Sequence, residues 1–171
     1  MYDWEAICHE HGDLVWASVY RVLDDYAASC DCVQEVFLEA WQRASKDPVL
    51  DWEGFLRWLS VRRAIDHVRQ RHLGLAQYTV SGDTTESLAV NDSPAAPVEL
   101  DELMARLVTE LAKLPGRQAE AFWLRAIEDR PYAEIAQLLA TNSNEVGVLI
   151  HRARDFLRLA LSEFNPSVLK E

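Results

Sequence analysis

Five arginines gather in one short stretch of the chain, where they could bind the phosphates of a nucleic acid. Between positions 57 and 72 only Asp66 opposes them, and the arginines are Arg57, Arg62, Arg63, Arg69 and Arg71. Guanidinium groups form paired hydrogen bonds with phosphate oxygens, so such a run favours a surface that follows a nucleic-acid backbone. The whole chain has a formal net charge of −11, which opposes non-specific DNA binding. The stretch therefore predicts a local basic face on an acidic protein.

A second group of residues, near the C-terminus, predicts a helix-turn-helix. Pro131 suits the first turn of a short helix that ends near Leu139. Asn142 and Glu145 form an Asn variant of the capping box, which begins the last helix. Two buried stripes are expected, first Ile135, Ala136 and Leu139, then Val146, Ile150, Ala153 and Leu157. Such a pair of helices can place the second one in the DNA major groove, although a plain helical hairpin has the same pattern.

Cysteine and histidine residues in the first part of the chain are of types that bind metals. Cys30 and Cys32 are two positions apart and point to different sides of a helix, whereas Cys8 and His11 fit an apolar stripe. With His9 they do not make a convincing ligand set, so we expect no metal and no cofactor. The chain also has no glycine-rich phosphate loop and no nucleophile elbow, so we expect no catalytic residue and no enzyme activity.

Composition favours a helical protein of one medium or two small domains. The chain has 171 residues, is 49% hydrophobic and contains only 6 glycines. No apolar run approaches the roughly 18–20 residues that a membrane span needs, and the acidic N-terminus does not fit a signal peptide. The sequence therefore predicts an all-α, cytoplasmic protein with reduced cysteines.

The expected helices form two blocks. The first block, residues 1–75, has three expected helices: about Trp4 to Leu23, about Ala28 to Ala44, and Trp52 to about His72. Residues 76–99 have no basic residue and many small polar ones, which predicts a flexible acidic linker. The second block, residues 100–164, contains the helix-turn-helix, and residues 165–171 form a tail. A linker of this kind permits both a compact inhibited form and an extended bound form.

Several segments resemble the bacterial sigma-70 factors of the extracytoplasmic-function (ECF) group. Residues 31–41, D-C-V-Q-E-V-F-L-E-A-W, are similar to the family's domain 2 pattern D-L-V-Q-E-x-F-L-x-A-W. Residues 52–60 and 65–69 are similar to the family's F-x-x-W-L-x-x-I-A and I-D-H-L-R. Residues 114–154 resemble domain 4, with L-P before the first helix, Y-x-E-I-A in the second and H-R-A-R in the third. The resemblance implies two small helical domains, a sigma domain 2 bundle and a sigma domain 4 helix-turn-helix, joined by the linker.

The resemblance implies that core RNA polymerase is the main partner. In this family the second helix docks on a coiled coil of the β′ subunit, and domain 4 sits on the β flap. The core-binding residues implied here are Asp31, Gln34, Glu35 and Leu38. An acidic and polar helix face is suited to a positively charged partner. We expect Phe37 and Trp41 to lie in the core, and an anti-sigma factor would be a further partner.

The resemblance also implies that promoter DNA is bound. The loop from Ser45 to Glu53 would capture an unstacked base of the −10 element, and the basic helix would hold the single strand. The −10 residues implied are Arg62, Arg63, His67, Arg69, Gln70 and Arg71, with Arg62 standing where the family usually has Asn. The −35 residues implied on the last helix are Ser143, Asn144, Val148, His151, Arg152 and Arg154.

The recognition helix departs most from the family. Where the family reads T-V-K-S-R-L-H-R-A-R, residues 145–154 read E-V-G-V-L-I-H-R-A-R. Glu145 would oppose phosphates, while Val148 and Leu149 can touch a thymine methyl but offer phosphates no hydrogen bond. We therefore predict weak or unusual −35 recognition, with Val148 and Leu149 available to a protein interface. Two alternatives stay open: a sigma-like protein that binds polymerase or an anti-sigma factor without reading DNA, and a helix-turn-helix regulator.

Overall fold

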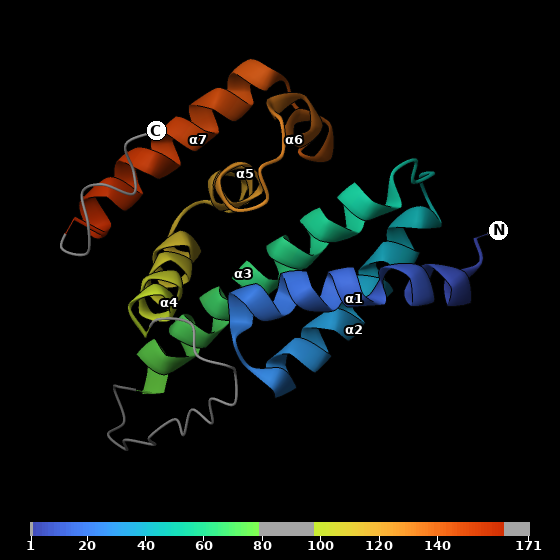
Figure 1. The fold of residues 1–171 in the computed structure, drawn as a ribbon, viewed down its shortest axis with the longest axis horizontal. Helices are drawn as coiled ribbons and strands as arrows, with labels where there is room; N and C mark the ends of the chain where they lie inside the picture. The colour runs from blue at the N-terminus through green and yellow to red at the C-terminus, as the bar shows by residue number, and fades with distance from the viewer. Residues whose placement is uncertain (1, 79–97, 163–171) are drawn as a thin grey trace.

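The computed structural model describes residues 2–78 and 98–162, and all the regular secondary structure within these ranges is α-helical (Figure 1). The all-α prediction is therefore confirmed. The N-terminal block contains α1 (Trp4–Leu23), α2 (Tyr26–Ala44) and α3 (Trp52–Tyr78). The C-terminal block contains α4 (Val98–Lys113), α5 (Gly116–Ala126), α6 (Tyr132–Leu138) and α7 (Ser143–Ala160). Within the described ranges, no helix combines the length and the apolar character needed to cross a membrane.

The helix ends differ from the expected ones at two places. α2 begins at Tyr26 rather than Ala28, because the Asp25 carboxylate accepts a hydrogen bond from the Ala28 amide at 2.9 Å and caps the helix. α3 extends to Tyr78, past the expected end at His72. The expected linker, residues 76–99, thus overlaps the last residues of α3 and the first residues of α4. Its residues 79–97 and the expected tail lie outside the described residues.

The core of the N-terminal block lies between α1, α2 and α3. Its fully buried side chains include Val15, Val19, Val36, Leu56 and Leu59. On α2 the buried stripe runs through positions 29, 32, 36, 40 and 44, each three or four residues after the last. Trp41 follows the stripe by one position and is 51% exposed, so our prediction that it belongs to the core was wrong.

The loop before α3 is held by aromatic side chains. The Tyr2, Trp4 and Trp52 rings meet edge to face, with ring centroids 5.1 to 6.2 Å apart. The Tyr2 hydroxyl also accepts a hydrogen bond from the Val49 amide at 2.9 Å. Asp51 caps the start of α3 by accepting from the Gly54 amide at 3.0 Å. The loop is therefore fixed at both ends to the N-terminal block.

The helix-turn-helix forms as predicted. Asn142 caps α7 by accepting a hydrogen bond from the Glu145 amide at 2.9 Å. The residues of both expected stripes are buried: Ile135, Ala136, Leu139, Val146, Ile150, Ala153 and Leu157. Leu149 is buried as well, because it lies one turn from Val146 and Ala153 on the same side of α7. Our prediction that Leu149 is available to DNA or to a protein was therefore wrong.

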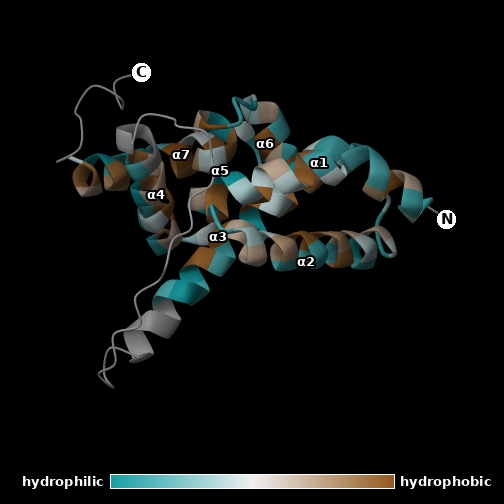
Figure 2. Ribbon diagram, turned by 60° about the horizontal axis from the view of Figure 1, so that its bottom comes forward, coloured by the Kyte–Doolittle hydropathy of each residue, from teal (hydrophilic) through white to brown (hydrophobic). Residues whose placement is uncertain are grey.

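The central helix α3 packs against both blocks. α1 and α2 cover one side of it, and α4 and α5 approach it from the other (Figure 1). Figure 2 shows hydrophilic residues on the part of α3 that projects past the neighbouring helices. Because α3 contacts helices of both blocks, the basic stretch of the sequence, residues 57–72, lies where the two blocks meet.

Candidate functional site

The outer face of α2 carries all four residues that we expected to bind polymerase. Asp31, Gln34, Glu35 and Leu38 are exposed, and Leu38 has 56% of its surface accessible. Their spacing of three and four puts them on one side of the helix, away from the buried stripe. The exposed Trp41 continues this face one turn beyond Leu38. The spacing of three residues between Leu38 and Trp41 was the sequence signal that could have placed Trp41 on this exposed face.

On the side of α3 that faces α2, two of the expected −10 residues pair with acids. Arg63 binds the Glu39 carboxylate at 2.5 Å, and the Nε2 atom of His67 lies 3.0 Å from a Glu35 oxygen. Burial alone would raise the pKa of Glu39, but the hydrogen bond and charge of Arg43, together with Arg63, hold that pKa below its usual range. Glu35 therefore links the proposed polymerase face to the basic helix.

On its opposite side, α3 turns Arg69 toward the C-terminal block. Its Nε and Nη2 atoms donate to the carbonyl oxygens of Ala112 and Leu114, both at 3.0 Å. Its Nη1 atom donates to Asp66, the one acid within the arginine run, at 2.7 Å. Arg62 lies between the two sides, 3.9 Å from a Glu120 oxygen of α5 and 3.9 Å from a Glu39 oxygen of α2.

The remaining two expected −10 residues lie near the projecting end of α3. Gln70 and Arg71 are both exposed. Arg71 is 4.0 Å from the Asp25 carboxylate, a distance that leaves its charge largely solvated. The structure thus divides the six expected −10 residues among three surroundings: the α2 side, the C-terminal block and solvent.

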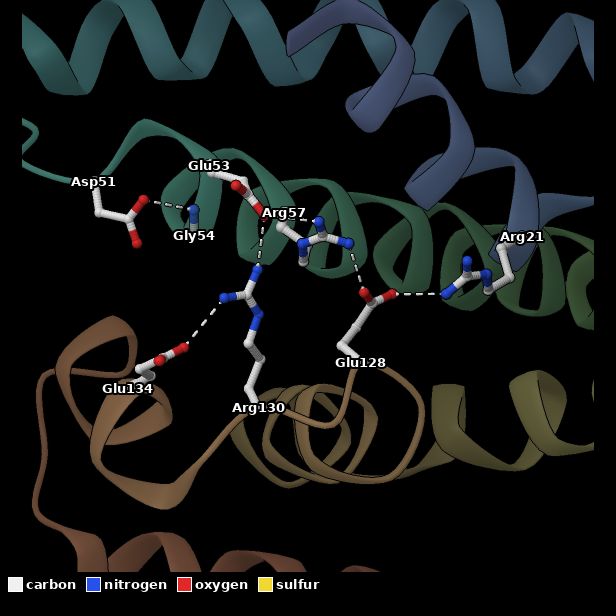
Figure 3. Close-up of polar contacts among 8 residues, drawn as sticks. All are labelled: Arg21, Asp51, Glu53, Gly54, Arg57, Glu128, Arg130 and Glu134. Atoms are coloured by element: carbon white, nitrogen blue, oxygen red, sulfur yellow. Dashed lines mark hydrogen bonds and ion pairs between the residues drawn. The ribbon is translucent and has the colours of Figure 1, made fainter.

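A cluster of ion pairs joins α3 and α1 to the loop between α5 and α6 (Figure 3). Glu128 of that loop accepts from Arg57 at 2.8 Å and from Arg21 at 3.1 Å. Next to it, Arg130 donates to Glu53 at 3.2 Å. A hydrogen bond from Arg57 lowers the pKa of Glu53, and Arg130 adds to that effect. Sequence reasoning missed Glu128, because no local pattern marks a pairing over 71 residues.

Trp58 and Glu120 form a second contact between the blocks. The indole Nε1 atom donates to the Glu120 carboxylate at 2.9 Å, and both residues are buried. The guanidinium groups of Arg43 and Arg62 lie 5.0 and 5.5 Å from the centre of the Trp58 ring. Glu120 was also missed, although an acid inside the apolar run of α5 is a signal for a buried partner.

The loop that we expected to capture a base borders an open hollow of about 470 Å³. The loop side contributes Pro48, Leu50 and Phe55, and α6 contributes Gln137 and Leu138. Leu50 is 97% exposed. The hollow is therefore bounded by both blocks, and the C-terminal block lies beside the loop.

The expected −35 residues lie mainly on the outer face of α7. Ser143, Asn144, Val148, His151 and Arg152 are exposed, whereas Arg154 is half-buried on another side of the helix. The Glu145 side chain bends back toward the turn, where it bonds the Thr141 hydroxyl and lies 3.6 Å from Arg117. The carboxylate that we expected to oppose DNA phosphates thus has its own cation.

The cysteines show no sign of a shared site. Cys8 is exposed, so our placement of it in the apolar stripe of the first helix was wrong. Cys32 is buried, and burial together with the charge of Glu35 raises the pKa of its thiol to about 12. In the described part of the chain, no three His, Cys, Asp or Glu side chains are grouped to hold a metal ion.

Comparisons with known proteins agree with the two blocks. The family model for sigma-70 region 2 matches residues 7–73, and the model for sigma-70 region 4 matches residues 104–157. An "ECF RNA polymerase sigma factor SigK" of Mycobacterium ulcerans is 33% identical over 149 residues, covering 84% of this chain and 76% of that relative. A SigK of Mycobacterium tuberculosis is 33% identical over 154 residues with the same coverage.

The fold is similar to that of a solved sigma-factor structure. It is the sigma factor RpoE of Bartonella quintana, crystallised in complex with the anti-sigma factor NepR. The match has a TM-score of 0.54 at 15% identity and covers 95% of this chain and 98% of that chain. At this identity the likeness concerns the fold alone.

Proposed function

The chain belongs to the ECF group of the sigma-70 family, and from this premise we propose how its two blocks divide the work of a sigma factor. As a sigma factor it binds core RNA polymerase and directs promoter recognition and transcription initiation. The observation that carries this function is the match to both sigma-70 regions, in the family's order, over residues 7–73 and 104–157. RNA synthesis would belong to the polymerase, so we assign this chain no catalysis and no cofactor. Its place of action would be the bacterial cytoplasm.

The outer face of α2 would dock on the polymerase β′ coiled coil. Asp31, Gln34 and Glu35 offer this partner acidic and polar groups, and Leu38 and Trp41 add an exposed apolar centre. A large aromatic side chain flanked by polar groups is typical of the residues that contribute most to protein interfaces. This combination supports docking through α2 in preference to a merely solvated helix surface.

The basic helix α3 and the loop before it would open the −10 element. The loop at residues 45–53 is anchored by the Tyr2, Trp4 and Trp52 rings, which would give a captured base a rigid support. Arg62, Arg63, His67, Arg69, Gln70 and Arg71 would follow the strand. Those turned toward the C-terminal block or toward α2 must exchange their present partners for phosphates before they can do so.

The C-terminal block would contact the −35 region weakly. Ser143 and Asn144 at the start of α7 and Arg152 in its middle are exposed, and they can bond phosphates or base edges. Val148 and Leu159 are exposed apolar side chains on the same helix, and they cannot form hydrogen bonds with phosphates or base edges. They favour a second candidate function for this block, contact with a protein such as the β flap or an anti-sigma factor.

A run-off transcription assay with purified core polymerase, paired with pull-down of that core, tests the function. Promoter-specific transcripts together with core binding are expected. Core or anti-sigma binding without transcripts would support the second candidate alone, and duplex binding without core binding would support a conventional regulator. Arg71→Ala should impair opening while sparing core binding, because Arg71 is exposed. Glu102→Ala, at an exposed position of α4, is the control.

A further inference from the structure

Between the two blocks, oxygen atoms of the C-terminal block face cations of the N-terminal block. We propose that this packing is a closed form of the free protein, in which the C-terminal block occupies the surface of α3 that would hold the promoter single strand. The inference rests on the proposed function, since Arg62 and Arg69 are among the residues proposed to follow the strand. Single-stranded DNA and the C-terminal block would then compete for them, and the occupied form would not bind DNA.

Arg69 shows the competition most directly. All three of its donor groups have acceptors within 3.0 Å: two carbonyl oxygens at the end of α4, and Asp66. The last carbonyls of a helix lack partners within it and carry its partial negative charge. Ala112 and Leu114 therefore offer Arg69 what a phosphate would offer, two oxygen acceptors with negative character. A DNA phosphate can take the place of these two carbonyls on Arg69 only after α4 has moved.

Glu128 closes the next part of the same surface. Its carboxylate side chain has only 4% of its surface accessible, and each of its oxygens accepts from a different arginine of the N-terminal block. Arg57 comes from α3 and Arg21 from α1, so one side chain of the C-terminal block ties together two helices (Figure 3). A carboxylate held by two arginines is again the arrangement of a bound phosphate.

Glu120 fills the space between these two contacts. It accepts the hydrogen bond of Trp58 at 2.9 Å and lies 3.9 Å from Arg62, which rests on the same indole. Trp58 and Arg62 could otherwise offer a base or a phosphate a stacking and charged surface. The closed form thus places acidic or carbonyl oxygens at three successive positions along α3.

Contacts of this kind can hold a closed form and still allow it to open. The ion pairs between the blocks gain Coulomb energy but require desolvation of both charges, so their net stabilisation is small. Removing both arginines, by contrast, would leave the buried Glu128 carboxylate without compensation. DNA phosphates or a bound polymerase can replace the lost partners and shift the equilibrium toward the open form.

Glu128→Lys tests the closed form, because it places a third cation beside Arg21 and Arg57. Small-angle X-ray scattering of the full chain should give a larger radius of gyration than the wild type. Fluorescence anisotropy should show binding of a short labelled single-stranded DNA on the order of tenfold tighter, because the binding-competent fraction rises. An unchanged radius together with unchanged affinity would overturn the proposal.

A matched control separates opening from a simple change in charge. Glu102→Lys makes the same charge change at an exposed position of α4. It should keep the wild-type radius and gain far less affinity for DNA. An equal gain in both variants would overturn the proposal, since net charge would then explain it. If Glu128→Lys loses helical circular dichroism, Glu128→Gln replaces it, with a smaller effect expected in the same direction.

The wild-type chain supplies a further test without any substitution. Saturating single-stranded DNA should raise the amide hydrogen exchange of residues 127–130, which join α5 to α6. DNA binding with unchanged exchange there would contradict competition. These measurements contain no polymerase, so they test the closed form separately from the proposed function. Failure to bind core would reject the proposed function alone. Failure of the scattering and DNA-binding tests would reject the closed form alone.

Discussion

The indole Nε1 of Trp58 donates a hydrogen bond to the carboxylate of Glu120 at 2.9 Å, and this bond joins two buried residues from different blocks of the protein. A buried carboxylate that keeps a good donor costs little, whereas one that loses its donor is strongly destabilising. The pair therefore fixes where α5 lies along α3.

Trp58→Phe should lower the free energy of unfolding by about 1–3 kcal/mol, because it leaves Glu120 buried without its donor. Urea denaturation followed by circular dichroism measures this change. Glu120→Gln keeps an oxygen acceptor for Trp58 and should cost less. Equal stability of Trp58→Phe and the wild type would show that the bond between the blocks contributes nothing.

Glu39→Gln should destabilise the protein at neutral pH but not in acid. Arg43 and Arg63 hold the pKa of Glu39 below its usual range despite its burial, so the folded state favours the carboxylate. That contribution is complete above the ordinary carboxyl pKa of about 4.3 and is lost as the pH falls through the lower folded value.

Urea denaturation of the wild type and Glu39→Gln at neutral and acidic pH checks this dependence. The stability difference should be about 1–3 kcal/mol at neutral pH and should shrink in acid. Glu10→Gln, at an exposed position of α1, is the control. A difference that stays constant with pH would contradict the role assigned to the Glu39 charge.

Leu38→Arg should weaken binding to core polymerase by at least about tenfold, because it places a cation against a positively charged coiled coil and removes apolar contact. Trp41→Ala should have a similar effect. Both side chains are exposed, so the free energy of unfolding should change little. Ala17→Arg adds the same charge at an exposed position of α1 and should bind normally. Pull-down with titrated core measures the affinities, and wild-type binding by both variants would reject α2 as the docking face.

Gly147→Ala should raise the stability of the C-terminal block by up to about 1 kcal/mol, because glycine is unfavourable inside a helix. A methyl group at this position would meet the Tyr132 ring at 3.7 Å, an ordinary contact. Thermal denaturation measures the gain. A lower melting temperature than the wild type would mean that α6 and α7 pack more tightly here than the structure indicates.

Features of the fold that depend on short stretches of chain could be predicted from the sequence. The first helix, the cap at Asn142 and the buried stripes of α6 and α7 all agree with the structure. Each of these follows from residue spacing over a few turns. The α2 stripe was harder, because Trp41 and Ala40 are adjacent and both are apolar. The buried stripe passes through Ala40, and Trp41, one position later, faces outward.

The sequence by itself determined the all-α fold, its two blocks and its membership of the sigma-70 family, because helix periodicity and motif order are properties of neighbouring residues. Only the tertiary structure decided which acceptor groups the arginines of α3 meet. Arg57 and Glu128 are 71 residues apart, and Arg69 and Leu114 are 45 apart. The packing of α3 against α1, α2, α4 and α5 brings such pairs together. The charge pattern along one helix cannot specify these partners, because it does not distinguish which arginine of that helix will meet a given acceptor.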